Sequence, residues 1–170
     1  MHKLVIEPLF QNVQLPKYSN DGDVGLDITF HNLKRVYRHI GGNNELMIDS
    51  DERLKKELVD GALELQYLER ALIGVGFKAT AGAGFEIQIR PRSGLALKNG
   101  LTVLNSPGTI DPGYRDEIGI ILINLSRKVQ RINFGDRIAQ LVVKPVTTCE
   151  IVVGKLDDLS RGGGFGSTGV

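Results

Sequence analysis

The stretch Gly108–Asn124, GTIDPGYRDEIGIILIN, joins a turn to a strand, and the interpretation of the whole chain starts from it. Pro112 and Gly113 are typical turn residues, and they place Asp111 at the entrance of an apolar run. From Ile118 onward the run IGIILIN is rich in residues that favour a buried strand. An acid fixed at such a point is a candidate general base, although a turn acid often has only a structural role.

Short apolar runs of the same kind recur along the chain, separated by Gly, Pro, Asn and Asp. In FEIQIR, the apolar Phe85, Ile87 and Ile89 alternate with polar residues, which indicates a half-buried strand. Many short strands at close spacing predict an all-β sandwich or barrel. The predicted strands are KLVIEPL, LELQYL, ALIGVGF, GFEIQIR, LTVLN, IGIILIN, RINF and RIAQLVVKPV.

Two segments depart from this pattern. Residues 50–60, SDERLKKELVD, begin with a serine suited to an N-cap, continue with acids, and carry an apolar stripe at Leu54 and Leu58 before a glycine stop. They predict one exposed helix. GLALKNG, Gly94–Gly100, is too short for an independent helix and predicts a single turn supported by the surrounding sheet.

Composition excludes several classes of protein. The length of 170 residues suits one domain, and 21 basic against 20 acidic residues, with no basic block, disfavour nucleic-acid binding. Cys149 is the only cysteine, so no internal disulfide is possible, and the three histidines lack the spacing of a zinc site. No apolar run approaches the roughly 20 residues that cross a bilayer, and no signal peptide is apparent. We therefore expect a soluble, cytoplasmic protein without membrane partners.

Three further segments are candidates for functional residues. In RPRSGLALKNG, Arg92 and Ser93 precede a turn of helix and suit a phosphate, although capping of a strand end and of a helix is the simpler interpretation. NFGDRIAQLVV predicts a hairpin turn followed by an edge strand that carries Arg137 and Gln140. The tail SRGGGFGSTGV cannot fold by itself, and its bare backbone amides suit an anion.

Taken in order, five motifs resemble those of the homotrimeric dUTPase (dUTP pyrophosphatase) family: DVGLDI, PRSG, NSPGTIDPGY, GDRIAQLVV and RGGGFGSTG. The resemblance covers nearly the whole chain except about residues 32–60. It implies a jelly-roll-like distorted β-barrel over residues 1–158, with one short surface helix in an insertion at about 32–60. Residues 159–170 would be a flexible glycine-rich arm that closes over a neighbouring active site. A homotrimer would hold three sites, each built from all three chains.

The resemblance also implies a reaction, the hydrolysis of dUTP to dUMP and pyrophosphate. This activity would keep uracil out of DNA and supply dUMP for dTMP synthesis. Asp111 would deprotonate a water molecule that attacks the α-phosphorus. The expected cofactor is Mg²⁺, held mainly by the substrate phosphates, with Asp27 contacting it through water.

The same resemblance assigns substrate-binding residues in the barrel. Arg92, Ser93 and Gln140 would contact the triphosphate. Asn105 would read the edge of uracil, because its amide offers both a donor and an acceptor. Tyr114 would lie beneath the deoxyribose and exclude the 2′-hydroxyl of UTP.

In the arm, the resemblance implies that Phe165 stacks on uracil and that Arg161, Ser167 and Thr168 meet the γ-phosphate. Only three residues separate Arg161 from Phe165, where the family more often has four. The substrate-binding residues expected in full are Arg92, Ser93, Gly94, Asn105, Gly108, Ile110, Tyr114, Gln140, Arg161, Phe165, Gly166, Ser167 and Thr168.

Several alternatives stay open at this point. The segment before LELQYL is longer than usual in the family, and it is either a solvated insertion or a contact for a protein partner. dCTP deaminases share the fold and a similar turn, but Ile121 stands where they carry a catalytic glutamate and Tyr114 replaces their phenylalanine. Asp116 stands where the family more often has glycine. A further alternative is a catalytically inactive, nucleotide-responsive binding module that contacts a partner through residues 43–60.

Overall fold

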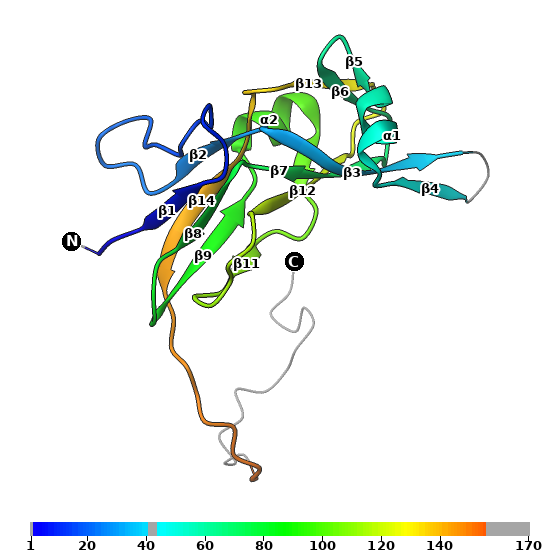
Figure 1. The fold of residues 1–170 in the computed structure, drawn as a ribbon. Coiled ribbons are helices and arrows are strands. Elements are labelled where there is room, and N and C mark those ends of the chain that lie inside the picture. The colour runs from blue at the N-terminus through cyan, green and yellow to red at the C-terminus, as the bar shows by residue number, and fades with distance from the viewer. Residues whose placement is uncertain (1, 41–43, 156–170) are drawn as a thin grey trace.

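The computed structural model describes residues 2–40 and 44–155. In this part of the chain, most strands join two antiparallel sheets (Figure 1). The larger has the order β10-β12-β7-β3-β4, made of Leu101–Val103, Gly119–Asn124, Arg70–Gly74, Asn32–His39 and Glu45–Ile48. The second has the order β11-β9-β14-β2, made of Gly108–Ile110, Phe85–Arg90, Arg137–Pro145 and Leu26–Thr29.

Two smaller sheets complete the described fold. β1 (Val5–Pro8) pairs with β8 (Phe77–Thr80), and β6 (Ala62–Leu65) lies between β13 (Gln130–Asn133) and β5 (Leu58–Val59). The prediction of an all-β protein is confirmed. No helix in residues 2–40 or 44–155 is long and apolar enough to span a membrane.

Alternate residues of both large sheets fill one core. Ile87 and Ile89 of β9 are buried, as their spacing predicts, and so are Ile120 and Leu122 of β12. Burying one such side chain stabilises a fold by about 1.5–3 kcal/mol. The largest fully buried side chains are Phe30, Phe77, Ile28, Leu63, Leu65, Ile73, Ile87, Leu101, Ile118, Ile120, Leu122 and Ile138.

The segment 32–60 is not a simple solvated insertion. Its strand β3 pairs with β7 on one side and with β4 on the other, and Val36 is fully buried. Charged residues conceal this strand in the sequence, because Arg38 is partly buried and donates to Glu57 at 2.7 Å and to Glu69 at 2.6 Å. Contact between this segment and a protein partner stays a prediction.

The helix predicted over residues 50–60 is shorter than expected. α1 spans Asp51–Lys56, and Ser50 occupies the N-cap position without a side-chain hydrogen bond to the helix. Asp60 and Gly61 have φ angles of 50° and 74°, so they form the two-residue turn of the β5–β6 hairpin. Gly61 therefore belongs to a hairpin rather than to a helix stop, and the Asp-Gly pair was the overlooked signal.

Two other local predictions also need correction. β14 lies between β9 and β2 and is not an edge strand, and the turn before it does not close a hairpin because β13 pairs with β6. α2 spans Ser93–Asn99, which is longer than a single turn, and it ends at Gly100 with φ of 65°.

Candidate active site

A buried carboxylate organises the first half of the candidate site. Asp27 on β2 lies opposite Gln140 on β14, and its side chain is 8% exposed. Its oxygens accept hydrogen bonds from Arg92 Nε at 3.0 Å and from Arg137 Nη1 at 3.0 Å. Ser19 Oγ donates at 3.1 Å and Gln140 Nε2 at 3.3 Å. The structure thus brings together three residues singled out from the motifs, Asp27, Arg92 and Gln140, and adds two more donors.

The electrostatics of this cluster keep Asp27 ionised. Burial by itself raises the pKa of Asp27, but the charge of Arg92 and the hydrogen bonds from Arg92, Ser19 and Gln140 bring it below the ordinary value of 3.8. Arg92 also donates to the main-chain carbonyl of Arg137 at 3.2 Å. The two guanidinium groups are therefore held side by side by one carboxylate and one carbonyl.

Sequence spacing did not indicate that Arg137 joins this cluster. Residues 137 and 140 are three apart, and in a regular strand such residues point to opposite faces. The pairing of β14 with β2 shifts register between Arg137 and Ala139, and this irregularity lets Arg137 and Gln140 both reach Asp27.

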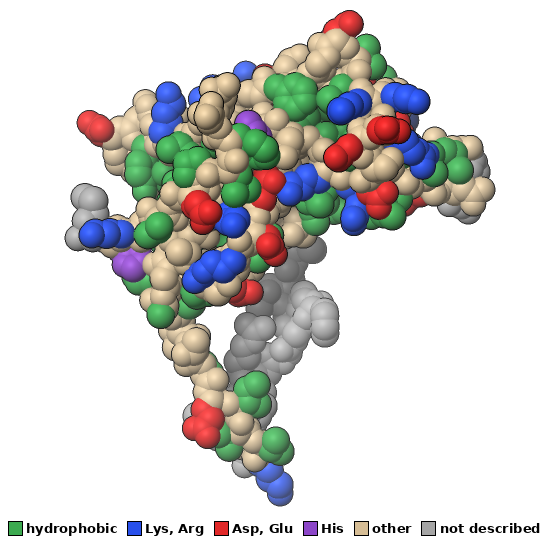
Figure 2. All heavy atoms as spheres, viewed as in Figure 1, with side chains coloured by type: hydrophobic (Ala, Val, Ile, Leu, Met, Phe, Trp, Pro, Cys, Tyr) green, Lys and Arg blue, Asp and Glu red, His purple; other side chains and the backbone are tan. Residues whose placement is uncertain are grey.

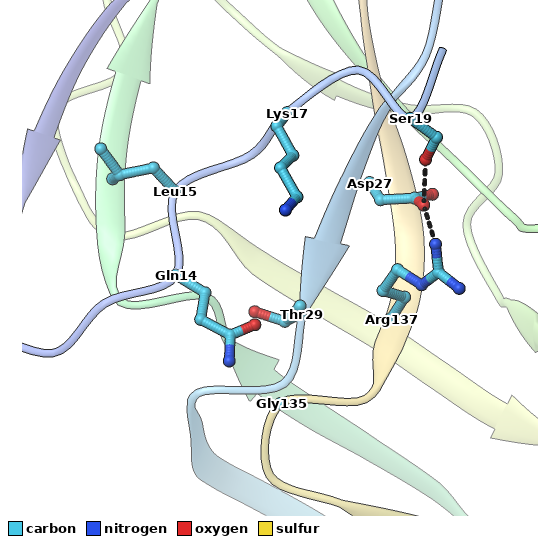
Figure 3. A pocket seen from close by; sticks show the side chains of 8 residues that line it. All are labelled: Gln14, Leu15, Lys17, Ser19, Asp27, Thr29, Gly135 and Arg137. Carbon is cyan, nitrogen blue, oxygen red and sulfur yellow. Dashed lines mark hydrogen bonds and ion pairs between the residues drawn. The ribbon is translucent and has the colours of Figure 1, made fainter.

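A cavity of about 530 Å³ lies beside the carboxylate, between the loop that precedes β2 and the start of β14 (Figure 3). Ser19 and Arg137 meet Asp27 at its edge. A second hollow of about 340 Å³ has Arg92, Arg131 and Arg137 in its wall. The residues lining the first cavity are Gln14, Leu15, Lys17, Ser19, Asp27, Thr29, Gly135 and Arg137.

The second half of the candidate site follows β11. Asp111 is exposed, and its main-chain carbonyl accepts from the amide of Tyr114 at 3.1 Å, which closes the predicted turn. Tyr114 is half-buried, and its hydroxyl donates to the carbonyl of Glu117 at 2.9 Å. The turn is also tied to β8, because Thr80 Oγ1 donates to the carbonyl of Pro112 at 3.0 Å.

The remaining predicted residues of this half surround β11. Gly108 is buried opposite Ile89, and a Cβ added to Gly108 would lie 3.3 Å from the amide nitrogen of Asn105. Glycine therefore leaves room for the Asn105 side chain, which is itself exposed. Ile110, at the end of β11, packs partly buried against the core.

One chain does not bring the two halves together. Ile110 is opposite Ile87, so Asp111 is level with Glu86, whereas Arg92 follows Glu86 by six residues. At about 3.3 Å per residue of extended chain, the six residues from Glu86 to Arg92 span roughly 20 Å. A general base must lie within hydrogen-bond reach of the water that it activates, so one copy does not hold both groups at one phosphate.

The other predicted residues divide into two groups. Ser93 and Gly94 are exposed in the first turn of α2, directly after Arg92. Arg161, Phe165, Gly166, Ser167 and Thr168 lie outside the described residues.

The residues of the cluster do not form a protein metal centre. Residues 2–40 and 44–155 contain no group of three His, Cys, Asp or Glu side chains placed to hold a metal ion. Asp27 shares its carboxylate with two guanidinium groups, so it does not fit a direct ligand of Mg²⁺. This arrangement fits an ion carried by substrate phosphates and water, and the outer contact of Asp27 with such an ion stays a prediction.

The fold and this cluster define an all-β protein in which two arginines, Arg92 and Arg137, are held together by one buried carboxylate. The family model described as dUTPase matches residues 61–169. The chain is 56% identical to a deoxyuridine 5′-triphosphate nucleotidohydrolase of Nautilia profundicola, over 98% of this chain and 99% of that protein. It is 42% identical to a protein of the same name from Hydrogenobaculum sp., over 99% of each. The chain belongs to the dUTPase family, and the prediction of an enzyme of this family is confirmed.

Solved structures support the same architecture. The Staphylococcus bacteriophage 80alpha dUTPase with dUPNHPP has a TM-score of 0.73 at 23% identity, and each chain is covered in full. A dUTPase from phage phi11 of S. aureus, whose structure reveals a structural Mg(II) ion, has a TM-score of 0.66 at 20% identity, over 92% of this chain and 99% of that chain. The predicted jelly-roll-like barrel is confirmed.

Proposed function

We propose that the chain hydrolyses dUTP to dUMP and pyrophosphate, with Asp111 activating a water molecule that attacks the α-phosphorus. The observation that carries this proposal is the pair Arg92 and Arg137, held ready on Asp27 beside Gln140. Preorganised cations of this kind stabilise charge that develops on transferring phosphoryl oxygens. Membership of the dUTPase family identifies the substrate class.

The phosphate end of the proposed site is open to a ligand. The side chain of Arg137 is 56% exposed and that of Arg92 is 25% exposed, so part of each guanidinium faces solvent. Ser93 and Gly94 extend this end into the first turn of α2. A Mg²⁺ ion bound to the triphosphate would neutralise its charge and orient it, and Asp27 would contact that ion only through water.

The base end of the proposed site is Asp111 with Tyr114. Asp111 is exposed beside its turn, so a water molecule can reach its carboxylate. Tyr114 offers a ring face to the deoxyribose and excludes a 2′-hydroxyl. Asn105, beside Gly108, reads uracil.

The two ends would meet between copies of the chain. The spacing of roughly 20 Å along the chain supports an arrangement in which Asp111 of one copy serves the arginines of another. Figure 1 shows the chain leaving the barrel after β14, where Ile151, Val152 and Val153 are 95%, 77% and 99% exposed. Such an apolar, β-branched run suits pairing with another copy. We therefore propose the homotrimer, with residues 159–170 closing over a neighbouring site. The cytoplasmic location also stays a prediction.

The test is pyrophosphate release from dUTP with Mg²⁺, beside UTP, dTTP and dCTP, for the natural chain and for Asp111→Asn. We expect cleavage of dUTP alone, and loss of turnover in Asp111→Asn while nucleotide still binds. Asp116→Asn is the matched control, because Asp116 is an exposed acid on the same turn and should retain activity. Ammonia release from dCTP would instead indicate a deaminase, and nucleotide binding without any turnover would indicate a binding module.

A further inference from the structure

The turn that carries Asp111 and Tyr114 is attached to the barrel through Glu117, which the motifs did not single out. Glu117 contributes in two ways. Its main-chain carbonyl accepts from the Tyr114 hydroxyl at 2.9 Å, and its carboxylate points into the barrel, where the side chain is 7% exposed. Glu117 therefore connects the Tyr114 hydroxyl to the groups that bind the Glu117 carboxylate.

Two partners hold the carboxylate of Glu117. Gly76, between β7 and β8, donates its amide to Oε1 at 2.7 Å. Lys34 of β3 places its ammonium 2.6 Å from Oε2. A buried carboxylate must be compensated in this way, and a charge-assisted contact is stronger than a neutral one. The Tyr114 turn is thereby fixed to a strand of the segment 32–60.

The backbone leaves space for this ion pair. Gly74 lies between β3 and β12, opposite Asn32 and Gly119. It has no left-handed φ, so local conformation does not require glycine there. A Cβ at this position would lie 2.7 Å from Cε of Lys34 and would also overlap the carboxylate of Glu117 and the Oδ1 of Asn32. A larger residue at position 74 would therefore displace the ends of the side chains that form the ion pair.

We propose that the Lys34–Glu117 ion pair positions Tyr114 against the deoxyribose and so sets the selectivity for dUTP over UTP. This inference rests on the proposed function. Exclusion of a 2′-hydroxyl depends on where the tyrosine ring lies, and a small displacement of the ring weakens that exclusion. Lys34 and Glu117 act through Tyr114 and do not touch substrate.

The test compares kcat and KM for dUTP and UTP in Lys34→Met, Lys34→Arg and the natural chain. We expect Lys34→Met to lower the ratio of kcat/KM for dUTP over UTP by about tenfold. Lys34→Arg keeps the charge and should restore most of the ratio. The matched control is Arg70→Met, which breaks the ion pair of Arg70 with Glu45 at 2.7 Å in the same sheet, at the end of β7 opposite to Gly74.

A purely structural pair would lower the melting temperature of Lys34→Met without changing the ratio, and an unchanged ratio in active enzyme overturns the proposal. A second readout does not depend on activity. The NMR resonance of ring-labelled Tyr114, assigned with Tyr114→Phe, should shift in Lys34→Met and not in Arg70→Met. If the natural chain cleaves no dUTP, the proposed function fails, and this resonance alone decides whether Lys34 controls the position of the ring.

Discussion

Arg92 Nε lies 3.0 Å from Asp27 Oδ1, across a sequence separation of 65 residues. Arg137 approaches the other oxygen of the same carboxylate at the same distance. Two cations that would repel each other are thus held together by one buried anion, at the place where we propose that the triphosphate binds. The charge of Asp27 therefore matters for stability as well as for the site.

Removing that charge should destabilise the fold. Asp27→Asn keeps the shape of the side chain but leaves the two arginines without their anion, so we expect a loss of about 1–3 kcal/mol in the free energy of unfolding at pH 7. Urea unfolding measures this loss. Asp21→Asn, in the exposed loop before β2, is the control and should leave the stability unchanged.

The same residue predicts a dependence on pH. The folded-state pKa of Asp27 is lower than its ordinary value of 3.8, so the carboxylate stabilises the folded state fully above about pH 4. That contribution is lost as the pH falls through the folded-state pKa. Unfolding of the natural chain should therefore become easier below pH 4, and more steeply than unfolding of Asp27→Asn. Parallel stability curves for the two proteins in acid would contradict this.

Tyr114 predicts a second effect, at high pH. Burial raises the pKa of its phenol above 10.0, the charges of Asp116 and Glu117 raise it further, and Lys34 partly offsets them. A phenolate cannot donate to the Glu117 carbonyl, so the stability that depends on the neutral phenol is complete below about pH 10 and is lost as the pH rises through the folded-state pKa.

An absorbance titration of the tyrosines tests this. The natural chain should show one more ionising phenol than Tyr114→Phe, and that phenol should ionise above pH 10. If the missing phenol ionises at or below the ordinary value, the hydroxyl of Tyr114 is not held as the structure has it.

Asn124, at the end of β12, is fully buried with all its hydrogen-bonding capacity used. Its amide donates to the carbonyls of Leu65 and Lys128, both at 2.8 Å, and its oxygen accepts from the amide and the hydroxyl of Ser126. In Asn124→Asp, a carboxylate oxygen would replace the donating amide group and face both carbonyl oxygens. We therefore expect the free energy of unfolding to fall by about 2–5 kcal/mol. Thermal unfolding measures it, and Asn12→Asp on the exposed N-terminal loop should cost little. A small effect at both sites would mean that the Asn124 network does not support the fold.

The sequence predicted the strands whose signal is local. Ile87 and Ile89 show their alternation directly, and so they lie in the core. β3 was missed because its charged residues look solvent-exposed, although Arg38 is neutralised by acids 19 and 31 residues away. Figure 2 shows lysines and arginines interspersed with acids on the face that it displays, as this pairing requires.

The candidate site was predictable as a set of motifs but not as a geometry. The motif residues Asp27, Arg92 and Gln140 meet because strand pairing joins β2, β14 and β9. The participation of Arg137 depends on a register shift, which residue spacing does not encode. The ion pair of Lys34 and Glu117 joins residues 83 positions apart, neither of which belongs to a motif.

The separation of Asp111 from Arg92 leads to the last prediction, which concerns two inactive variants. Asp111→Asn lacks the proposed base, and Arg92→Ala lacks a proposed phosphate ligand. If each site takes Asp111 from one copy and Arg92 from another, a co-refolded mixture contains sites in which both residues are natural. Random assembly of equal amounts gives about a quarter of the sites both natural residues, so we expect up to about a quarter of the natural activity.

Each variant refolded alone is the control, and mixing without refolding separates subunit exchange from contamination. If both residues served the same site within one chain, each copy would carry a defect in its own site and the mixture would stay inactive. Because Arg92 also binds Asp27, a milder variant is needed in parallel, and Gln140→Ala serves, since Gln140 makes a single contact to that carboxylate, at 3.3 Å, where Arg92 makes two. Recovered turnover after Asp111→Asn is refolded with Arg92→Ala or with Gln140→Ala, together with a sedimentation mass of three times 18.6 kDa, would establish a trimer whose sites are shared between chains.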